Sequence, residues 1–138
     1  MTKSLDSVCK ALQTVAAGLE SVEKAEEYAK ESATLGVFAV SYPEEGEIDA
    51  AQLPETKSIH TVITEIHFKT VTLELTLADA IPMIEEFAVA ALADPTLGGT
   101  CDTIVGPIHY RFGYLNWGGK KESHVGPQFC TKVKIRTP

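Results

Sequence analysis

Apolar residues recur at helical spacing near the start of the chain and indicate an amphipathic helix. The apolar face consists of Leu5, Val8, Cys9, Leu12, Val15, Ala16 and Leu19. Residues three or four positions apart share one side of a helix, so these side chains form one stripe. Ser4 or Thr2 can cap the helix start, and Gly18 loosens its end. The pattern predicts a helix over residues 4–18.

A second apolar stripe lies in the later half of the chain, at Ile84, Phe87, Ala88, Ala91 and Leu92. Asp79 can cap this helix, and Pro82 suits its first turn. The residue before a proline disfavours helical backbone, so the helix is expected to end just before Pro95. We expect Phe87 and Leu92 to be buried against a sheet.

Period-2 patterns predict strands before this second helix. Residues 36–43 form a short apolar run that Pro43 is expected to end. Residues 59–68 alternate, and residues 71–77 alternate with the opposite parity. A strand cannot switch parity without a bulge or a turn, so this stretch is either two strands or one long bulged strand.

Two further strands are predicted after the second helix. The first covers residues 104–114, with Gly106 and Pro107 as bend points and Tyr110 and Tyr114 facing inward. Residues 116–121 are typical of a hairpin loop. The last strand alternates at Phe129, Thr131, Val133 and Ile135.

Three segments connect these elements. Residues 20–31 fit either a helix or a short strand. Residues 44–55 are acidic, lie between two prolines and have no clear period, which predicts a long surface loop. Residues 94–100 are rich in turn-forming residues, and Gly98 is expected to adopt a positive φ. The order of elements predicts one α+β domain over residues 1–138, with a mostly antiparallel sheet packed against two helices.

Charge narrows the class of function. The 138 residues carry 12 basic and 19 acidic side chains, a net charge of −7, which argues against a generally basic nucleic-acid binder. Residues 101–138 carry 6 basic and 2 acidic side chains, whereas the rest of the chain is acidic. No stretch resembles a membrane span or an export signal, so we expect a soluble protein made in the cytoplasm.

The sequence contains no recognisable catalytic or metal-binding pattern. Three widely spaced cysteines indicate free thiols, and no histidine has a ligand partner at helical spacing. Gly98 and Gly99 follow a helix, whereas phosphate-binding glycines precede one. A solvated helix face accounts for the adjacent Glu85 and Glu86. We therefore expect no catalytic residue, no metal and no cofactor.

The segment from Ile84 to Ile135 resembles the C-terminal half of the tail terminator proteins of long-tailed phages. An apolar helix runs into a turn-rich connector, then a strand ends in a glycine-rich hairpin, and a last strand follows. The matching stretches are Ala90–Asp102, Tyr114–Gly119 and Phe129–Ile135. Within the connector, Asp94, Pro95, Leu97, Gly98 and Gly99 carry the likeness.

The resemblance implies a structural virion protein with no enzymatic activity. Such proteins form a ring, expected here to be a hexamer, at the head-proximal end of the tail tube. The ring ends tube polymerisation and joins the tail to a head-closure or neck protein, and DNA passes through its lumen. The implied partners are further copies of the chain, the tail tube protein and the head-closure protein, with assembly in the host cytoplasm and no membrane.

Two charged segments are candidates for the contacts of such a ring. They are the acidic residues Glu44, Glu45, Glu47 and Asp49, and the basic residues Lys132, Lys134 and Arg136. A repeated head-to-tail contact needs two complementary patches on each subunit. Two alternatives remain open: another phage neck or minor tail protein, or a small α+β enzyme or ligand-binding domain with an unrecognised pocket.

Overall fold

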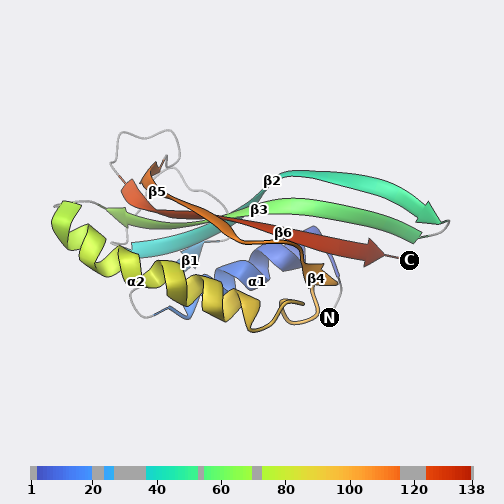
Figure 1. The fold of residues 1–138 in the computed structure, drawn as a ribbon, viewed down its shortest axis with the longest axis horizontal. Coiled ribbons are helices and arrows are strands. Elements are labelled where there is room, and N and C mark those ends of the chain that lie inside the picture. The colour runs from blue at the N-terminus through green and yellow to red at the C-terminus, as the bar shows by residue number, and fades with distance from the viewer. Residues whose placement is uncertain are drawn as a thin grey trace.

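The computed structural model describes residues 3–19, 24–26, 37–52, 55–69, 73–115 and 124–137. In this part of the chain, two helices lie on one side of a six-stranded, mostly antiparallel sheet (Figure 1). The strands follow the order β1-β2-β3-β6-β4, and β5 also pairs with β6. The fold is therefore α+β, as predicted. The elements are α1 (Leu5–Ala17), β1 (Lys24–Glu26), β2 (Val37–Gln52), β3 (Glu55–Lys69), α2 (Leu73–Leu92), β4 (Thr103–Ile104), β5 (His109–Leu115) and β6 (His124–Thr137).

Helix α1 forms where the apolar spacing predicts it. Ser4 caps its start, because the Ser4 hydroxyl oxygen accepts a hydrogen bond from the backbone N–H of Ser7 at 3.1 Å. Val8, Leu12 and Ala16, which are spaced four residues apart, have no exposed surface. The helix thus buries one stripe against the sheet, which confirms the predicted helix over residues 4–18.

Helix α2 begins at Leu73, so the predicted cap at Asp79 and the predicted strand over residues 71–77 are both wrong. Pro82 consequently lies inside the helix and not in its first turn. Every second residue from 71 to 77 is apolar, but Leu73 and Leu77 are also one helical turn apart. The pattern fits both a strand and a helix, and in the folded chain these residues are helical from Leu73 onward.

Strand β2 continues through Pro43, so the proline does not end it and the predicted loop over residues 44–55 is wrong. Instead, β2 and β3 pair beyond this point and form a long hairpin, called here the arm (residues 44–52 and 55–60) (Figure 1). The pairing register shifts between Pro43 and Glu45. Strands tolerate proline at such bulges and on sheet edges, where no ladder hydrogen bond is lost.

The main core lies between the two helices and one face of the sheet. Phe87 of α2 has no exposed surface, and its ring stacks on that of Phe129 with 4.1 Å between centroids. Leu92 is 49% exposed, contrary to expectation, because it is rotated about 100° around the helix from the buried Ala91. The sheet contributes Ala39, Val62, Ile66, Phe68, Phe129, Val133 and Ile135.

The strand predicted over residues 104–114 is two separate strands, β4 and β5. Gly106, with φ +69°, and Pro107 interrupt it. Tyr110 and Tyr114 are 59% and 79% exposed, so the prediction that they belong to the buried core is wrong. Because β5 pairs only with β6 among the described strands, its side chains lie at the margin of the sheet.

Strands β3 and β6 confirm the alternation predicted for residues 59–68 and 129–135 and extend beyond it at both ends. The predicted hairpin loop at residues 116–121 lies outside the described residues. So does most of the ambiguous segment 20–31, of which residues 24–26 form β1, parallel to β2. Neither α1 nor α2 is long and apolar enough to cross a membrane.

Candidate interaction surface

The charged residues singled out in the sequence lie on the face of the sheet opposite the helices, called here the open face. Directly paired residues of neighbouring strands point to the same side of a sheet. Ile135 points into the helix-side core, so its neighbours Lys134 and Arg136 point the other way. Three rows across β2, β3 and β6 share the open face: Glu45–Thr61–Lys132, Glu47–Ile59–Lys134 and Asp49–Lys57–Arg136.

The sequence singled out the acidic and basic candidates as two complementary patches. They lie on one face of one sheet, two strands or about 10 Å apart. Glu44 is exposed at the bulge. Within the described residues, no ion pair joins the two sets. A depression of about 350 Å³ separates them, lined by residues that include Glu47, Ile59 and Lys132.

A buried polar network occupies the same open face nearer the middle of the sheet. The Glu65 carboxylate accepts hydrogen bonds from the Tyr42 hydroxyl at 2.9 Å and from the Gln128 amide at 2.7 Å. The ring Nε2 of His67 lies 3.0 Å from the other Glu65 oxygen. Arg111 donates to the Gln128 amide oxygen at 3.2 Å. The network thus links β2, β3, β6 and β5.

Burial and hydrogen bonding oppose each other at Glu65. Burial alone would raise the pKa of Glu65, but hydrogen bonds from His67, Gln128 and Tyr42 outweigh it and hold the pKa below its usual value. Burial and the Glu65 charge raise the pKa of Tyr42. His67 has no exposed surface and Glu65 is 6% exposed, whereas Tyr42 and Gln128 are half-buried and Arg111 is exposed. Sequence reasoning missed this network, although Glu65 and His67 share one face of a strand.

The connector over residues 94–100 is a closed turn. The Asp94 carboxylate accepts hydrogen bonds from the Gly98 N–H at 2.8 Å and the Thr96 hydroxyl at 2.9 Å, and the Gly98 bond in particular lowers the pKa of Asp94. Gly98 and Gly99 have φ values of +70° and +82°, which confirms the positive φ predicted for Gly98. Leu97 also has a positive φ, of +49°.

The connector ties the helix layer to the sheet. The Pro95 carbonyl accepts a hydrogen bond from the Ile104 N–H at 2.9 Å, and the Thr100 carbonyl accepts one from the Ser4 N–H at 3.2 Å. Leu97 is 3% exposed and packs in the core. These residues therefore hold the end of α2, the start of α1 and strand β4 together.

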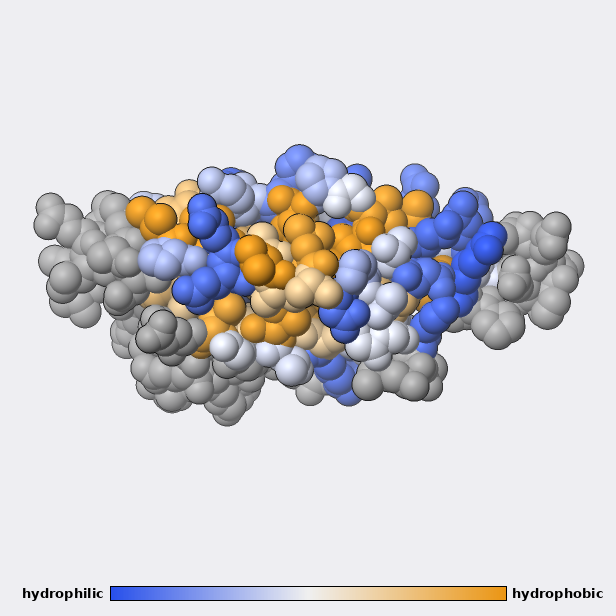
Figure 2. All heavy atoms as spheres, turned by 60° about the horizontal axis from the view of Figure 1, so that its bottom comes forward, coloured by the Kyte–Doolittle hydropathy of each residue, from blue (hydrophilic) through white to orange (hydrophobic). Residues whose placement is uncertain are grey.

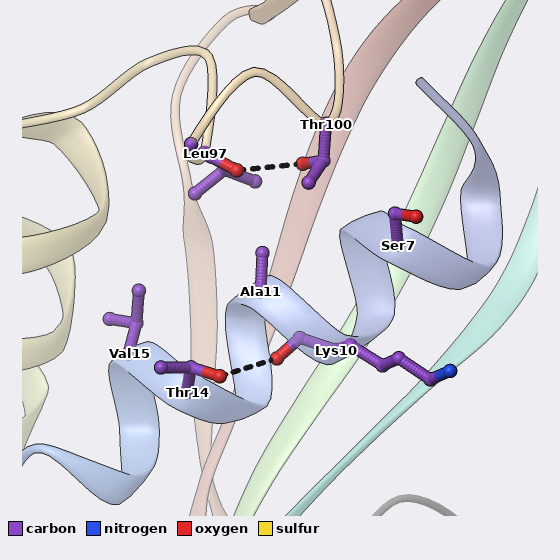
Figure 3. Close-up of a pocket in the computed structure, with 8 residues that line it drawn as sticks. Ser7, Lys10, Ala11, Thr14, Val15, Leu97 and Thr100 are labelled. Atoms are coloured by element: carbon purple, nitrogen blue, oxygen red, sulfur yellow. Dashed lines mark hydrogen bonds between the residues drawn. The ribbon is translucent and has the colours of Figure 1, made fainter. Parts of the chain in front are cut away.

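A groove of about 470 Å³ runs between α1 and the connector (Figure 3). Ala11, Val15 and Leu97 give it an apolar lining. Its hydroxyl groups are already used within the chain: Thr14 donates to the Lys10 carbonyl at 2.9 Å, and Thr100 donates to the Leu97 carbonyl at 2.8 Å. Among the described lining residues, Thr14 and Thr100 therefore direct their hydroxyl protons to the chain itself and not to a ligand.

The helix side also exposes apolar residues, which gather in the centre of the face shown in Figure 2. Ile81, Val89 and Leu92 of α2 are 57%, 70% and 49% exposed. Hydrophilic residues gather toward the arm on the same view.

The thiols have the properties of packed side chains. Burial, followed by the charge of Asp6, raises the pKa of Cys9 to about 11, and burial likewise raises that of Cys101 to about 11. Burial also raises the pKa of Cys130. In the part of the chain that the structure describes, no three His, Cys, Asp or Glu side chains are grouped to hold a metal ion.

No protein-family model matches the chain, and no curated protein matches it. The resemblance to tail terminator proteins therefore remains a prediction from the sequence.

Proposed function

We propose that this chain is a structural virion protein that forms a ring at the head-proximal end of a phage tail tube. The ring ends tube polymerisation and offers a surface to the head-closure or neck protein, while DNA passes through its lumen. The partners are other copies of the chain, the tail tube protein and the head-closure protein. The role requires no catalysis and no cofactor.

The arm is the observation that carries this proposal. Every residue from Pro43 to Asp49 is exposed, so this half of the arm adds little to the core of its own subunit. It nevertheless keeps strand pairing along its length and carries Glu45, Glu47 and Asp49 on the open face. An ordered, charged extension of this kind suits contact with another protein.

The charge of the chain also supports the proposal. A net charge of −7 opposes adhesion to DNA phosphates, which a lumen that lets DNA slide must avoid. The basic residues Lys132, Lys134 and Arg136 lie on the same open face as the acids, where they are available to a partner of opposite charge.

The groove beside α1 supports a second candidate, a small ligand-binding domain. Its volume of about 470 Å³ is large enough for a small ligand. Against this candidate, Thr14 and Thr100 direct their hydroxyls to the chain's own carbonyls, and the Lys10 ammonium lies 3.1 Å from the Asp6 carboxylate. The groove therefore offers mainly apolar contact, and the ring proposal is favoured.

Electron microscopy of the purified protein, alone and with tail tubes of the phage that encodes it, tests the proposal. We expect rings of one size and tubes with a ring at one end. An unrelated acidic monomer of similar mass is the control and should leave the tube ends bare. Particles of monomer size together with bare tube ends would contradict the ring role.

A further inference from the structure

We propose that neighbouring copies join edge to edge, the outer edge of β2 in one copy pairing with the outer edge of β5 in the next. The β2 edge is the stretch Pro43–Asp49, and the β5 edge is His109–Leu115. This inference rests on the proposed ring, because it names the surfaces through which the subunits meet. The partner is a second copy of the chain.

Both edges are free of strand partners within the described residues. Among the described strands, β1 pairs with β2 from Phe38 to Val40 and β3 alone pairs with the stretch Pro43–Asp49. Strand β5 pairs with β6 on one side and with no other described strand. An unpaired edge presents backbone N–H and C=O groups that another strand can satisfy.

Charges on the open face of the two edges are complementary. Glu45 and Glu47 lie on the open face of β2. On β5, His109 and Arg111 pair with Cys130 and Gln128, and so lie on the same face. Two β2 edges would bring carboxylates together, and two β5 edges would bring two Arg111 guanidinium groups together. The charges therefore oppose like-with-like pairing and favour the contact of β2 with β5.

The helix-side faces of the two edges are complementary in a different way. Ile48 on β2 is 71% exposed, and Tyr110 and Tyr114 on β5 are 59% and 79% exposed. Tyr110 pairs with the core residue Phe129, so it points to the helix side, as Ile48 does opposite Ser58. Aromatic and β-branched residues on adjacent strands stabilise each other. If the sheet continues between copies, the acids of β2 meet Arg111 on one face and Ile48 meets the tyrosines on the other.

Strand directions and levels fit a repeating contact. Strands β2 and β5 run in opposite directions within one subunit, so a continued sheet pairs them antiparallel. Through the register of β3, the β2 edge is aligned with residues 131–136 of β6, whereas β5 pairs with residues 124–130. The two edges are therefore staggered along the strand direction. Closing a ring through staggered edges requires strands that tilt against the ring axis. The contact uses two different patches, as a head-to-tail ring requires.

Two charge-reversal variants test the contact. The first, Glu45→Lys with Glu47→Lys, places lysines on the β2 edge. The second, His109→Glu with Arg111→Glu, places carboxylates on the β5 edge. Each variant alone brings like charges together, and its self-association constant in low salt should fall about tenfold or more by sedimentation velocity.

Mixing the two variants in equal amounts should restore assembly, because each reversed edge then meets an edge of opposite charge. Recovery in the mixture also shows that both variants are folded. The control variant is Glu85→Lys with Glu86→Lys, at two exposed positions of α2. It changes the net charge by the same amount as the first variant and should assemble normally. Ile48→Asp, at a 71% exposed position, should weaken assembly without a change of fold.

Normal assembly of both reversal variants would overturn the edge contact and leave the ring proposal intact. Separate assembly defects with no recovery in the mixture would also overturn it. A wild-type chain that stays monomeric at every concentration and leaves tail tubes bare would overturn both proposals.

Discussion

Gly126 on β6 is a residue whose identity the fold dictates. A Cβ atom added there would overlap the Ile66 carbonyl oxygen of β3, so the two strands could keep their spacing only without a side chain. Gly113 lies directly opposite on β5, and a Cβ there would meet nothing within 4 Å. The two glycines thus form a matched pair on neighbouring strands.

We predict that Gly126→Ala destabilises the protein by about 2 kcal/mol or more, because overpacking of a well-packed site forces backbone shifts. Gly113→Ala should change the free energy of unfolding by less than about 0.5 kcal/mol. Urea unfolding measures both. Equal effects of the two substitutions would contradict the close approach of β3 and β6.

Glu65 makes folding sensitive to acid. Because the pKa of Glu65 is lower in the folded chain than its usual 4.5, its ionised form stabilises the fold. This contribution is present in full above the unfolded pKa and is lost as the pH falls through the folded pKa. We predict that Glu65→Gln is less stable than wild type at neutral pH and that the difference narrows below pH 4.5.

Urea unfolding at a series of pH values down to about pH 3 measures this difference, and exposed Glu86→Gln on α2 is the control. The Glu86→Gln curve should run parallel to that of wild type. A Glu65→Gln deficit that stays constant across this range would show that the carboxylate charge is not what stabilises the network.

At the level of elements, the strength of the apolar pattern decided what the sequence could predict. Helix α1 and strands β3 and β6 carry regularly spaced apolar residues that pack in the core, and their spacing left one interpretation. The arm has exposed residues on both sides of β2, so its strand gave no apolar alternation to detect. The stretch 71–77 had apolar residues at spacings that suit both a strand and a helix, and only packing in three dimensions separates the two.

The charged residues of the open face could be predicted from the sequence, but their arrangement could not. Charge alone singled out Glu45, Glu47, Lys132 and Lys134. That these residues share one face depends on the register across β3, which in turn depends on the bulge beside Pro43. The exposed Tyr110 and Tyr114 were assigned to the core because alternation shows which residues share a face, but not how far the helices cover that face.

The packing of α2 on the sheet depends on Phe87. Its ring stacks on Phe129 and has no exposed surface. We predict that Phe87→Ala lowers the free energy of unfolding by about 3–5 kcal/mol, since it removes a large buried side chain and leaves a cavity. Val89→Ala, at a position 70% exposed on the same helix, should cost less than about 0.5 kcal/mol in urea unfolding. A loss for Phe87→Ala as small as that for Val89→Ala would contradict the packing of Phe87 in the core.

The arm and the covered part of the sheet should differ in local stability. Residues 61–68 of β3 are all buried, whereas residues 43–49 of β2 are all exposed. Local opening is easiest where few apolar contacts hold a strand. We predict that backbone amides of residues 45–49 exchange with deuterium much faster than those of residues 62–68 in the monomer. Equal protection would mean that the arm is as stable as the core.

At the scale of the whole molecule, the charge is arranged across the sheet, with acids at the β2 side and bases toward β6 and β5. Contacts between exposed charges are screened by salt, and such charges change the rate of association more than its strength. Raising the ionic strength from about 0.1 M to about 1 M shortens the Debye length from about 10 Å to about 3 Å. The Debye length of about 3 Å at 1 M salt is much shorter than the roughly 10 Å that separates neighbouring acids and bases within one subunit.

We therefore predict that self-association slows and weakens over this range of salt, while the free energy of unfolding of the monomer changes little. Stopped-flow light scattering measures the association rate, and urea unfolding of dilute protein at the same salt concentrations is the control. The Glu45→Lys, Glu47→Lys variant should associate more slowly than wild type at low salt, and added salt should speed its association because it screens the like charges. If wild type associates at the same rate throughout, the charged rows on the open face are solvated surface and play no part in bringing subunits together.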